Sequence, residues 1–495
     1  MVDTNHGYAI ALIQRGDVSV ILWAVVIAVL VWVIFSATQR KTRNMKIPPM
    51  VDAGLFEAMN TMLSSDAPWF ALLYAQKFDF QPFLVNALLP LGFVGDGDLA
   101  REILMDPKSS KPPQIYEPFN PVVGGSNVFT ASTESVRWKH SRKGMAPAFS
   151  SNNVARMNRV CKEMTENMIR ERLQPAMDQH YEIEICQEML LLTFSTICKG
   201  ALEYDIEPEE SFEVLHEFEI ANKEFFQKSN TNPCRKMPGA QWIFPEVHRA
   251  KIASARLQEF AFKVLASYRS KYYEGKDDSS QVDTVIRLVI ENQNYTSDKD
   301  RAADILTLLM GGTETTAYTL AFTLLELARN PKEATKLRIA VCETPEEDWN
   351  RLPPLRNVIR ESMRLHPTSA MGSVRLLGRD ITVKPEMIIP KGYFMFMSPI
   401  ILFRNPKVYE SPDCFLPGRW DSPSKKQLET FRPFAEGKRN CLGQSLANAE
   451  LHHVVGRLVK DFDFEEHDPG HLEYFMTMKP EGATMKIRRA HNNGS

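Results

Sequence analysis

The stretch PFAEGKRNCLGQS, residues 433–445, constrains the fold and chemistry of this chain more than any other feature of its sequence. It holds the pattern F-x-x-G-x-R-x-C-x-G, formed by Phe434, Gly437, Arg439, Cys441 and Gly443. With ordinary composition, such a pattern arises by chance in roughly one in ten thousand chains of this length. The pattern therefore indicates that a single thiol is built into a defined backbone setting.

The neighbouring residues indicate what this thiol does. Gly437 permits a sharp turn and leaves room for a flat ligand. Arg439 brings near Cys441 a cation that favours the thiolate and can grip a carboxylate. The run that follows is typical of a helix, so Cys441 is expected at a helix N-terminus, where the dipole stabilises a negative sulfur. Gly443 has no side chain and so leaves space at the start of that helix, and Phe434 can shield the sulfur from solvent. These features are those of a thiolate that ligates haem iron.

The remaining cysteines carry no comparable signal. The chain has no C-x-x-C and no short Cys/His cluster, which argues against a zinc ribbon or an iron–sulfur site. The absence of C-x-x-C-H excludes covalent c-type haem attachment. Scattered single thiols fit a reducing compartment, and we expect the six others to be small packing residues. These are the cysteines at positions 161, 186, 198, 234, 342 and 414.

An uncharged segment of 20 residues, Val18 to Ala37, is long enough to cross a bilayer as a helix. A cleaved signal peptide would have a shorter apolar run and a small-residue cleavage site, so the segment predicts an uncleaved anchor. The cations that follow it, from Arg40 to Lys46, predict that the rest of the chain lies in the cytosol. We expect a short tail over 1–17, the anchor over 18–37 and a basic, proline-containing hinge over 38–50.

The body of the chain is dominated by helical periodicity. A composition of 44% hydrophobic and 24% charged residues is that of ordinary globular protein, and a net charge of −2 gives no support for nucleic-acid binding. Strand-like patterns are short and clustered late, at 373–378, 380–383, 393–399, 473–480 and 483–489. Amphipathic runs predict helices at 151–174, 186–203, 208–228, 248–274, 298–329 and 444–461. The expected fold class is mainly α with small β-sheets.

The loop around Cys441 resembles the cysteine-ligand loop of the cytochrome P450 family, and the likeness extends over nearly the whole chain. It implies a cytochrome P450 fold preceded by one N-terminal transmembrane helix, with residues 51–495 as the catalytic domain. It also implies haem b as the cofactor, with Cys441 as the axial ligand of the iron. The last segment, TMKPEGATMKIRR at 477–489, is similar to the family's terminal strand pair.

A second motif, GGTETT from Gly311 to Thr316, resembles the family's [AG]-G-x-[DE]-T-[TS] box. Two adjacent glycines inside a helix cost about 1 kcal/mol each, so a packing or functional reason is expected. The resemblance implies that the glycines open a groove over the iron, and that Glu314 and Thr315 relay protons to O2. On its own the motif is equally compatible with a kink that carries solvated polar residues.

Two further motifs imply a structural network. ESMR at 361–364 resembles the family's E-x-x-R, and FLPGRW at 415–420 resembles its F-x-P-x-R-[FW] segment. An isolated Glu–Arg pair at this spacing is usually a surface ion pair worth a few tenths of a kcal/mol. The resemblance implies instead that Glu361, Arg364 and Arg419 form a buried network that braces the cysteine loop.

WKHSR at 138–142 matches the family's W-x-x-x-R. Trp138 and Arg142 share one helical face, so both can donate to one haem propionate. The resemblance adds Arg439 to this propionate set, and Arg375 as a fourth candidate.

Two departures from the family pattern stand out. The stretch ahead of E-x-x-R is short, so a connecting helix is expected to be missing. Members that bond haem covalently carry a glutamate where this chain has Gly311, so no ester link is expected. Among the histidines, His452 and His453 are expected to be ordinary helix residues, and His366 to end its helix before a proline.

Two surface features have both a plain and a functional interpretation. The aromatic residues between 224 and 247 are either core packing or a channel lid that dips into the membrane surface. A set of cations is either solvated surface or a docking patch for an acidic electron donor. This set comprises Lys139, Lys143, Arg432, Lys438 and Arg457.

The function that the resemblance implies is a membrane-anchored haem-thiolate monooxygenase. It would insert one atom of O2 into a lipophilic substrate: a fatty acid, sterol, terpenoid, carotenoid or xenobiotic. The chain carries no flavin or nicotinamide fingerprint, so electrons are expected from NADPH-cytochrome P450 reductase or another donor, and the endoplasmic reticulum is the expected membrane. The alternatives are a haem-thiolate isomerase or dehydratase that acts on peroxides without O2, and a non-catalytic haem-binding membrane protein. By analogy, residues 105–130, 205–250, 369–374 and 476–478 line the substrate pocket.

Overall fold

The computed structural model of the chain describes residues 46–87, 89–229, 232–273, 282–383 and 387–490. The expected tail and anchor, and most of the expected hinge, lie outside these residues. The last part of that hinge is described, and there Lys46 forms a bridge with Met387 and Met50 one with Leu84. This end of the hinge is therefore packed on the body and is not a free connector.

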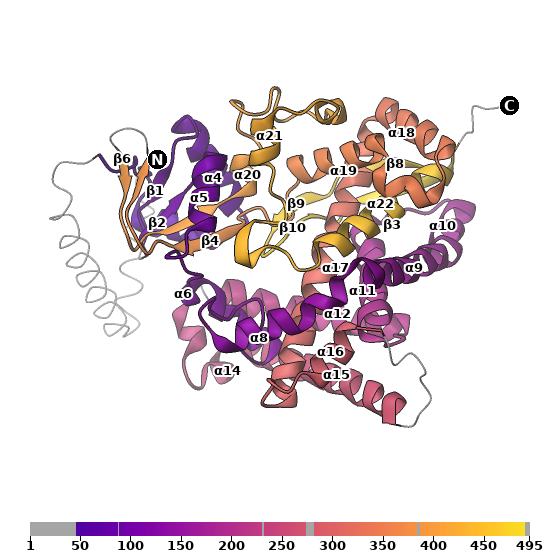
Figure 1. Ribbon diagram of the computed structural model, residues 1–495, viewed down its shortest axis with the longest axis horizontal. Helices are drawn as coiled ribbons and strands as arrows, with labels where there is room; N and C mark the ends of the chain where they lie inside the picture. Colours follow the sequence, from indigo (N-terminus) through magenta and orange to yellow (C-terminus); the bar gives the residue numbers. More distant parts are fainter. Residues whose placement is uncertain (1–45, 88, 230–231, 274–281, 384–386, 491–495) are drawn as a thin grey trace.

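Helices make up most of the described chain (Figure 1). The longer ones are α3 (Leu55–Met62), α4 (Ala67–Lys77), α5 (Gly97–Met105), α8 (Val136–Met145), α9 (Ser151–Met168), α11 (Ile185–Leu202), α12 (Pro208–Asn222), α15 (Pro245–Tyr273), α17 (Asp298–Arg329), α18 (Pro331–Glu343), α19 (Pro353–Leu365) and α22 (Gln444–Asp461). The shorter ones are α6 (Pro113–Tyr116), α7 (Asn120–Val123), α10 (Gln174–Gln179), α14 (Ala240–Ile243), α16 (Val285–Glu291), α20 (Pro399–Leu402) and α21 (Lys425–Thr430).

The strands form four small sheets. One sheet has the order β1 (Phe83–Val85), β2 (Leu91–Phe93), β7 (Phe394–Met397) and β4 (Ser373–Leu376), with only β2 and β7 parallel. A second has the order β3 (Ile183–Glu184), β11 (Thr484–Arg489) and β8 (Phe462–Asp468). The two remaining sheets are antiparallel pairs, β5 (Ile381–Val383) with β6 (Met387–Ile389) and β9 (His471–Tyr474) with β10 (Met478–Glu481). The expected class, mainly helical with small sheets, is confirmed.

The two helices that matter most for the site have the bounds that the sequence predicts, 298–329 and 444–461. The Ser297 side chain caps α17 by accepting the backbone N–H of Asp300, and Arg329 lies in the last turn, where it complements the helix dipole. The run predicted over 151–174 is α9 followed by a π-helical turn, Ile169–Leu173. Only a short 3₁₀ segment, Glu346–Arg351, separates α18 from α19, in line with the missing connecting helix.

The strand predictions are wrong in two respects. Strands also occur early, since β1, β2 and β3 precede residue 200. The run 473–480 is not one strand: it contains the end of β9, a turn at 475–477 and the start of β10. It therefore does not pair with 483–489, because β10 pairs with β9 while β11 pairs with β3 and β8. A single alternating pattern ran through a hairpin turn that contains no glycine or proline.

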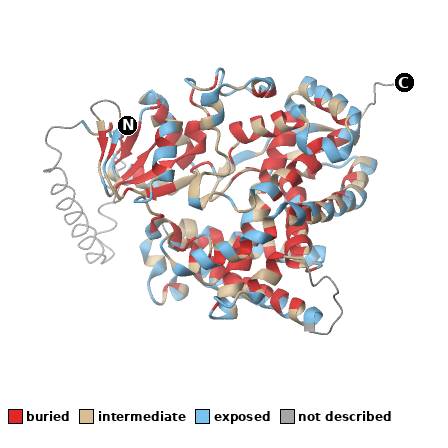
Figure 2. Ribbon diagram, in the orientation of Figure 1, coloured by how far each residue is buried: buried red, intermediate tan, exposed pale blue. Residues whose placement is uncertain are grey.

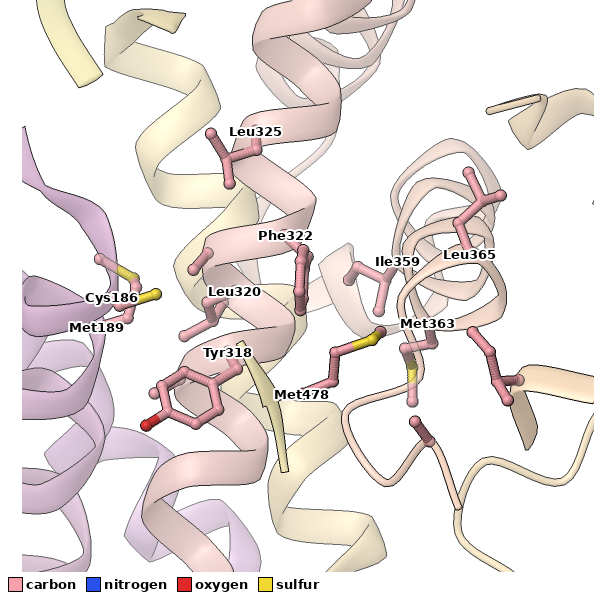
Figure 3. Packing of buried hydrophobic residues seen from close by; sticks show 14 of the residues in the cluster. Cys186, Met189, Tyr318, Leu320, Phe322, Leu325, Ile359, Met363, Leu365 and Met478 are labelled. Carbon is pink, nitrogen blue, oxygen red and sulfur yellow. The ribbon is translucent and has the colours of Figure 1, made fainter. Parts of the chain in front are cut away.

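The buried residues gather around α17, which passes through the middle of the molecule (Figure 2). One large core cluster contains the C-terminal half of α17 together with α19 and α22, and a second contains its N-terminal half with α11, α12 and α15. In Figure 3, Tyr318 points from α17 toward α11, whereas Phe322 points toward Ile359 and Met363 of α19. Among the described residues, α11 is the one helix long and apolar enough to span a membrane, but 72% of it is buried inside the protein, as in a core helix.

Candidate active site

The cysteine loop has the shape that its glycines predict. A short 3₁₀ turn, Gly437–Arg439, precedes Cys441, and the Cys441 backbone N–H donates to the carbonyl of Phe434 at 2.9 Å. Gly437 adopts φ +80°, and a Cβ there would lie 3.1 Å from the carbonyl oxygen of Leu104. The helix α22 begins three residues after Cys441. A side chain at Gly437 would therefore strain this loop, whereas at Gly443 the nearest atom to a Cβ, in Phe149, is 3.8 Å away.

The cation that acts on Cys441 is Arg142, and the expectation that Arg439 plays this part is wrong. Arg142 donates to the backbone oxygen of Asn440 at 2.9 Å and to its side-chain oxygen at 2.6 Å. Burial raises the pKa of the Cys441 thiol, while the Gly443 backbone N–H and the charge of Arg142 lower it. The loop thus presents a single thiol beside one cation.

Arg439 instead joins the cysteine loop to the segment before α8. Its guanidinium donates to the hydroxyl of Thr133 at 3.0 Å and to the carbonyls of Val128, at 3.2 Å, and Ala131. It also lies 3.9 Å from the ring centroid of Trp138, a cation–π contact. Trp138 is buried, and its Nε1 has no hydrogen-bond partner among the described residues. A buried indole N–H without an acceptor indicates that this position suits a ligand oxygen.

Three cations lie close together near this indole. Arg375 of β4 is buried and donates to the carbonyl of Val374 at 2.9 Å. Lys111 is also buried, with its Nζ 3.7 Å from the ring centroid of Tyr116. Burial lowers the pKa of Lys111, and the charges of Arg439 and Arg375 lower it further. No carboxylate of the described residues forms a salt bridge with Lys111, Arg375 or Arg439.

This cluster fits the carboxylates of haem b. Burying several like charges without an anion costs several kcal/mol for each ion, so the arrangement favours a ligand with more than one carboxylate. Sequence reasoning identified Arg375 and Arg439 but missed Lys111. Lys111 stands in the loop segment SSKPPQ, which has neither periodicity nor a motif, so no local signal could have revealed it. The residues present therefore fit the cofactor that the family pattern implies.

The two glycines of GGTETT have different surroundings, although α17 is continuous through both. A Cβ on Gly312 would lie 3.0 Å from the Cδ1 atom of Ile197 on α11, so Gly312 permits close packing of the two helices. Gly311 is exposed in the middle of a largely buried helix, and nothing lies within 4 Å of a Cβ placed there. Only Gly311 therefore borders an open space, and no kink in α17 is needed to explain the pair.

Glu314 and Thr315 point to different partners. Thr315 donates its hydroxyl to the carbonyl of Gly311 at 2.8 Å, so its side chain lies on the face of α17 that carries the open space. Glu314 accepts a hydrogen bond of 2.9 Å from the hydroxyl of Thr477. Burial raises the pKa of Glu314, and the contact with Thr477 opposes that shift. Thr477 lies in the segment 476–478 that was expected to line the pocket, but its hydrogen bond with Glu314 was not foreseen.

The structure brings Glu361, Arg364 and Arg419 together in one buried network. Arg364 forms two hydrogen bonds with Glu361, at 2.8 and 2.9 Å, and neither side chain is exposed. Glu361 also accepts from the Arg419 side chain, the Trp420 indole and the Leu416 backbone N–H, each at 2.9 Å. Arg364 donates further to the backbone carbonyls of residues 403, 412 and 414. The network ties α19 to the segment that leads to the cysteine loop.

The histidines have structural surroundings. His366 follows α19 as its C-cap and contacts Glu326 through Nε2 at 2.9 Å. His452 and His453 are both buried on α22, and burial lowers the pKa of each. Of the six other cysteines, those at 161, 186 and 198 are buried as expected, whereas those at 342 and 414 are exposed and 234 is half-buried. The expectation of core packing is therefore wrong for Cys342 and Cys414.

Each of the two surface features left open by the sequence contains both packed or paired residues and exposed ones. Trp242 is 85% exposed, so core packing does not explain it, whereas Phe225 and Phe226 pack against the second core cluster. In the set of cations, Arg457 is paired with Glu166 and Asp461, and Arg432 with Glu436. The members whose residues are exposed are Lys139, Lys143 and Lys438.

Comparison with known proteins places the chain in a family. The family model described as Cytochrome P450 matches residues 89–488. Cytochrome P450 4F8 of Homo sapiens is 26% identical, covering 72% of this chain and 73% of the relative. Leukotriene-B4 omega-hydroxylase 3 of Mus musculus is 26% identical, covering 74% of each chain, and Cytochrome P450 705A5 of Arabidopsis thaliana is 25% identical, covering 85% and 83%. The chain belongs to the cytochrome P450 family and is a haem-thiolate monooxygenase with haem b as its cofactor.

Proposed function

We propose that Cys441 is the axial ligand and that this enzyme oxidises a lipophilic substrate with electrons from a separate protein. The observation that carries the proposal is a single thiol in a loop that holds the Arg142–Asn440 contact and, through Arg439, meets an unpartnered buried indole N–H and a buried cation cluster. When bound, haem b supplies the activation of O2 that lets one oxygen atom enter a C–H or C=C bond.

The residues around the loop would hold the cofactor by its carboxylates. Lys111, Arg375 and Arg439 offer positive charge, and the Trp138 Nε1–H offers a neutral donor. Charge-assisted hydrogen bonds of this kind are roughly twice as strong as neutral ones. Arg142 would act on the loop through Asn440. The network of Glu361, Arg364 and Arg419 would hold in place the segment that leads to the cysteine loop, without contacting cofactor or substrate.

On the other side of the site, α17 would admit O2 and supply protons. Gly311 leaves space beside the helix, and Thr315 carries a hydroxyl on the same face. Glu314 would hold or release a proton for this face, because burial raises its pKa toward the range of a general acid. The presence of both groups speaks against a peroxide-rearranging isomerase, which needs no proton delivery, and against a non-catalytic haem carrier.

The substrate class and the surroundings are part of the same proposal. Two mammalian relatives carry names of the cytochrome P450 4F group and of a leukotriene-B4 omega-hydroxylase, so long-chain fatty acids are the first candidates among lipophilic substrates. Residues 18–37 would anchor the enzyme in the endoplasmic reticulum, with 51–495 as the cytosolic catalytic domain. The exposed Trp242 tip would rest on that membrane. Lys139, Lys143 and Lys438 would meet the acidic face of NADPH-cytochrome P450 reductase.

The spectrum of the reduced, CO-bound protein tests the ligand assignment. We expect the long-wavelength Soret band of thiolate-ligated haem in the wild type and its loss in Cys441→Ser. Cys342→Ser is the matched control, because that thiol is exposed on α18. A wild-type band at the position of histidine-ligated haem would refute thiolate ligation.

Turnover tests the rest of the function. Purified enzyme, reductase and NADPH are incubated with a panel of lipids under isotopically labelled O2, and label in the product identifies monooxygenation. Conversion of a lipid hydroperoxide without NADPH, and with no labelled product from any lipid, would favour the isomerase instead. Bound haem with neither reaction would favour the carrier.

A further inference from the structure

The turn between β9 and β10 is fixed against α17 by contacts at its base. The two strands pair with Met478 opposite Tyr474, and the Phe475 backbone N–H donates to the carbonyl of Thr477 at 3.2 Å. The Met478 backbone N–H donates to the carbonyl of Thr368 at 2.7 Å, and its side chain is buried beside Phe322 (Figure 3). Since these contacts fix the base of the turn, the position of Thr477 relative to α17 is set by the fold.

At this position Thr477 reaches Glu314. Its Oγ1 donates to Glu314 Oε2 at 2.9 Å, across 163 positions of sequence. The neighbouring Thr315 cannot serve in the same way, because its hydroxyl donates to the carbonyl of Gly311 in its own helix. Among the described residues, Thr477 is therefore the one that donates a hydrogen bond to the Glu314 carboxyl, and it belongs to the β9–β10 hairpin.

The chemistry of a hydroxyl lets it do more than hold the carboxyl. A threonine hydroxyl donates one hydrogen bond and can accept two, so while it donates to Glu314 it can accept from water. Thr477 is half-buried, so part of the residue meets solvent. The charged groups that act on Glu314 are Lys479 of β10 and Glu219 of α12, and Lys479 is itself paired with Glu473 and Glu481. The Thr477 hydroxyl is thus a polar group between the half-buried turn and a carboxyl buried beside α17.

We propose that Thr477 is a positioning residue that holds the Glu314 carboxyl and passes protons to it from solvent at the β9–β10 turn. In each transfer the hydroxyl proton of Thr477 moves to Glu314 Oε2 while the hydroxyl oxygen takes a proton from a hydronium ion of the solvent. One proton moves inward, the hydroxyl is regenerated and no electron is transferred. The inference deepens the proposed function, because it rests on Glu314 as the group that supplies protons at α17.

The test compares Thr477→Val, which keeps the shape but removes the hydroxyl, with Thr477→Ser, which keeps the hydroxyl. Thr335→Val is the matched control, because Thr335 is exposed on α18 and its hydroxyl donates to a carbonyl of its own helix. The first readout needs no turnover. The carboxyl infrared band of Glu314, assigned by its loss in Glu314→Gln, is titrated in the resting haem-loaded protein.

Removal of a hydrogen bond that favours the ionised carboxyl raises its titration midpoint, so Thr477→Val should shift the midpoint upward by about one pH unit. Thr477→Ser and Thr335→Val should titrate like the wild type. The second readout is the fraction of NADPH electrons recovered in oxidised lipid instead of hydrogen peroxide. It should fall by about tenfold in Thr477→Val, be restored in Thr477→Ser, and be accompanied by a larger solvent isotope effect.

The two readouts separate this inference from the function on which it rests. If the wild type oxidises no lipid but the infrared midpoint of Thr477→Val shifts, the proposed function is wrong while the Thr477–Glu314 contact is confirmed. The proton relay is then wrong too, because there is no reaction for it to supply. If the wild type is active and Thr477→Val keeps both its midpoint and its coupling, the inference is wrong. Loss of coupling with an unchanged midpoint also overturns it, because the turn would then act on the substrate and not on Glu314.

Discussion

Glu361 offers the sharpest test of the packing argument, through the substitution Glu361→Gln. The carboxylate accepts five hydrogen bonds, from Arg364 twice, Arg419, Trp420 and the Leu416 backbone, and it has no exposed surface. Glutamine keeps the size of the side chain but removes its charge and turns one of its acceptors into a donor. Arg364, which is also unexposed, and Arg419, which is 8% exposed, then remain as buried cations without an anion.

The expected cost follows from that burial. Breaking a buried ion pair on one side costs about 3–5 kcal/mol in unfolding free energy, because the remaining charge stays desolvated. Each 1.4 kcal/mol is a factor of about ten, so the equilibrium constant for unfolding should rise by roughly one hundredfold to several thousandfold.

A matched control has the same spacing in a different setting. Glu333 and Lys336 form an i,i+3 pair on α18 at 2.7 Å, close to the 2.8 Å of Glu361 and Arg364, but the Lys336 side chain is 70% exposed. Glu333→Gln should change the unfolding free energy by no more than about 0.5 kcal/mol. The comparison therefore tests what burial and the further partners of Glu361 add, since sequence spacing and distance are nearly equal.

The assay is urea unfolding of the haem-loaded proteins, followed by circular dichroism and by the Soret band. Equal slopes with a lower midpoint for Glu361→Gln would assign the change to stability. If Glu361→Gln and Glu333→Gln differ by less than about 1 kcal/mol, the inference that burial makes this pair essential is refuted.

Three further predictions concern separate features. Gly437→Ala should destabilise the cysteine loop by about 1–2 kcal/mol, because the backbone there has φ +80°. Thermal unfolding should show a lower midpoint, and the CO-bound Soret band should be weaker. An unchanged midpoint would contradict the inference that a side chain at Gly437 strains the loop. Vesicles of mixed phospholipids should shift the Trp242 emission, taken as the difference from Trp242→Phe, to shorter wavelength, and no shift would argue against membrane contact. Burial raises the pKa of Glu450 to about 8, so the folded state binds a proton that the unfolded state has released above its ordinary value of 4.5. The unfolding free energy should therefore fall as pH rises from about 4.5 to about 8, by up to about 1.4 kcal/mol per unit, and Glu450→Gln should flatten this slope.

Some of this site could be predicted because its determinants are local. The bounds of α17 and α22 follow from periodicity and proline-free runs, with a serine cap added at the start of α17, all within a few residues. The pattern around Cys441 identified the loop, and the positive φ of Gly437 agrees with the turn expected there. The Glu361–Arg364 spacing was equally visible, but its meaning depended on the resemblance, because the same spacing also occurs in the surface pair of α18.

Other expectations were wrong because closeness in the sequence is a poor guide to contact in the folded protein. Arg439 is two residues from Cys441, yet it contacts Trp138 and the segment 128–133, while Arg142, 298 positions from Asn440, holds the loop. The alternation across 473–480 suggested a strand, because the hairpin turn there contains neither glycine nor proline.

By itself, therefore, the sequence determined the mainly helical class, the identity of the cysteine loop and the position of the acid and hydroxyl on α17. Only the tertiary structure decided which cations meet near Trp138, including Lys111, and that Thr477 reaches Glu314. The physical reason is that caps, periodicity and backbone strain act within a few residues. A contact across 163 positions depends instead on the path of every element between them, and on the buried packing that fixes the ends of that path.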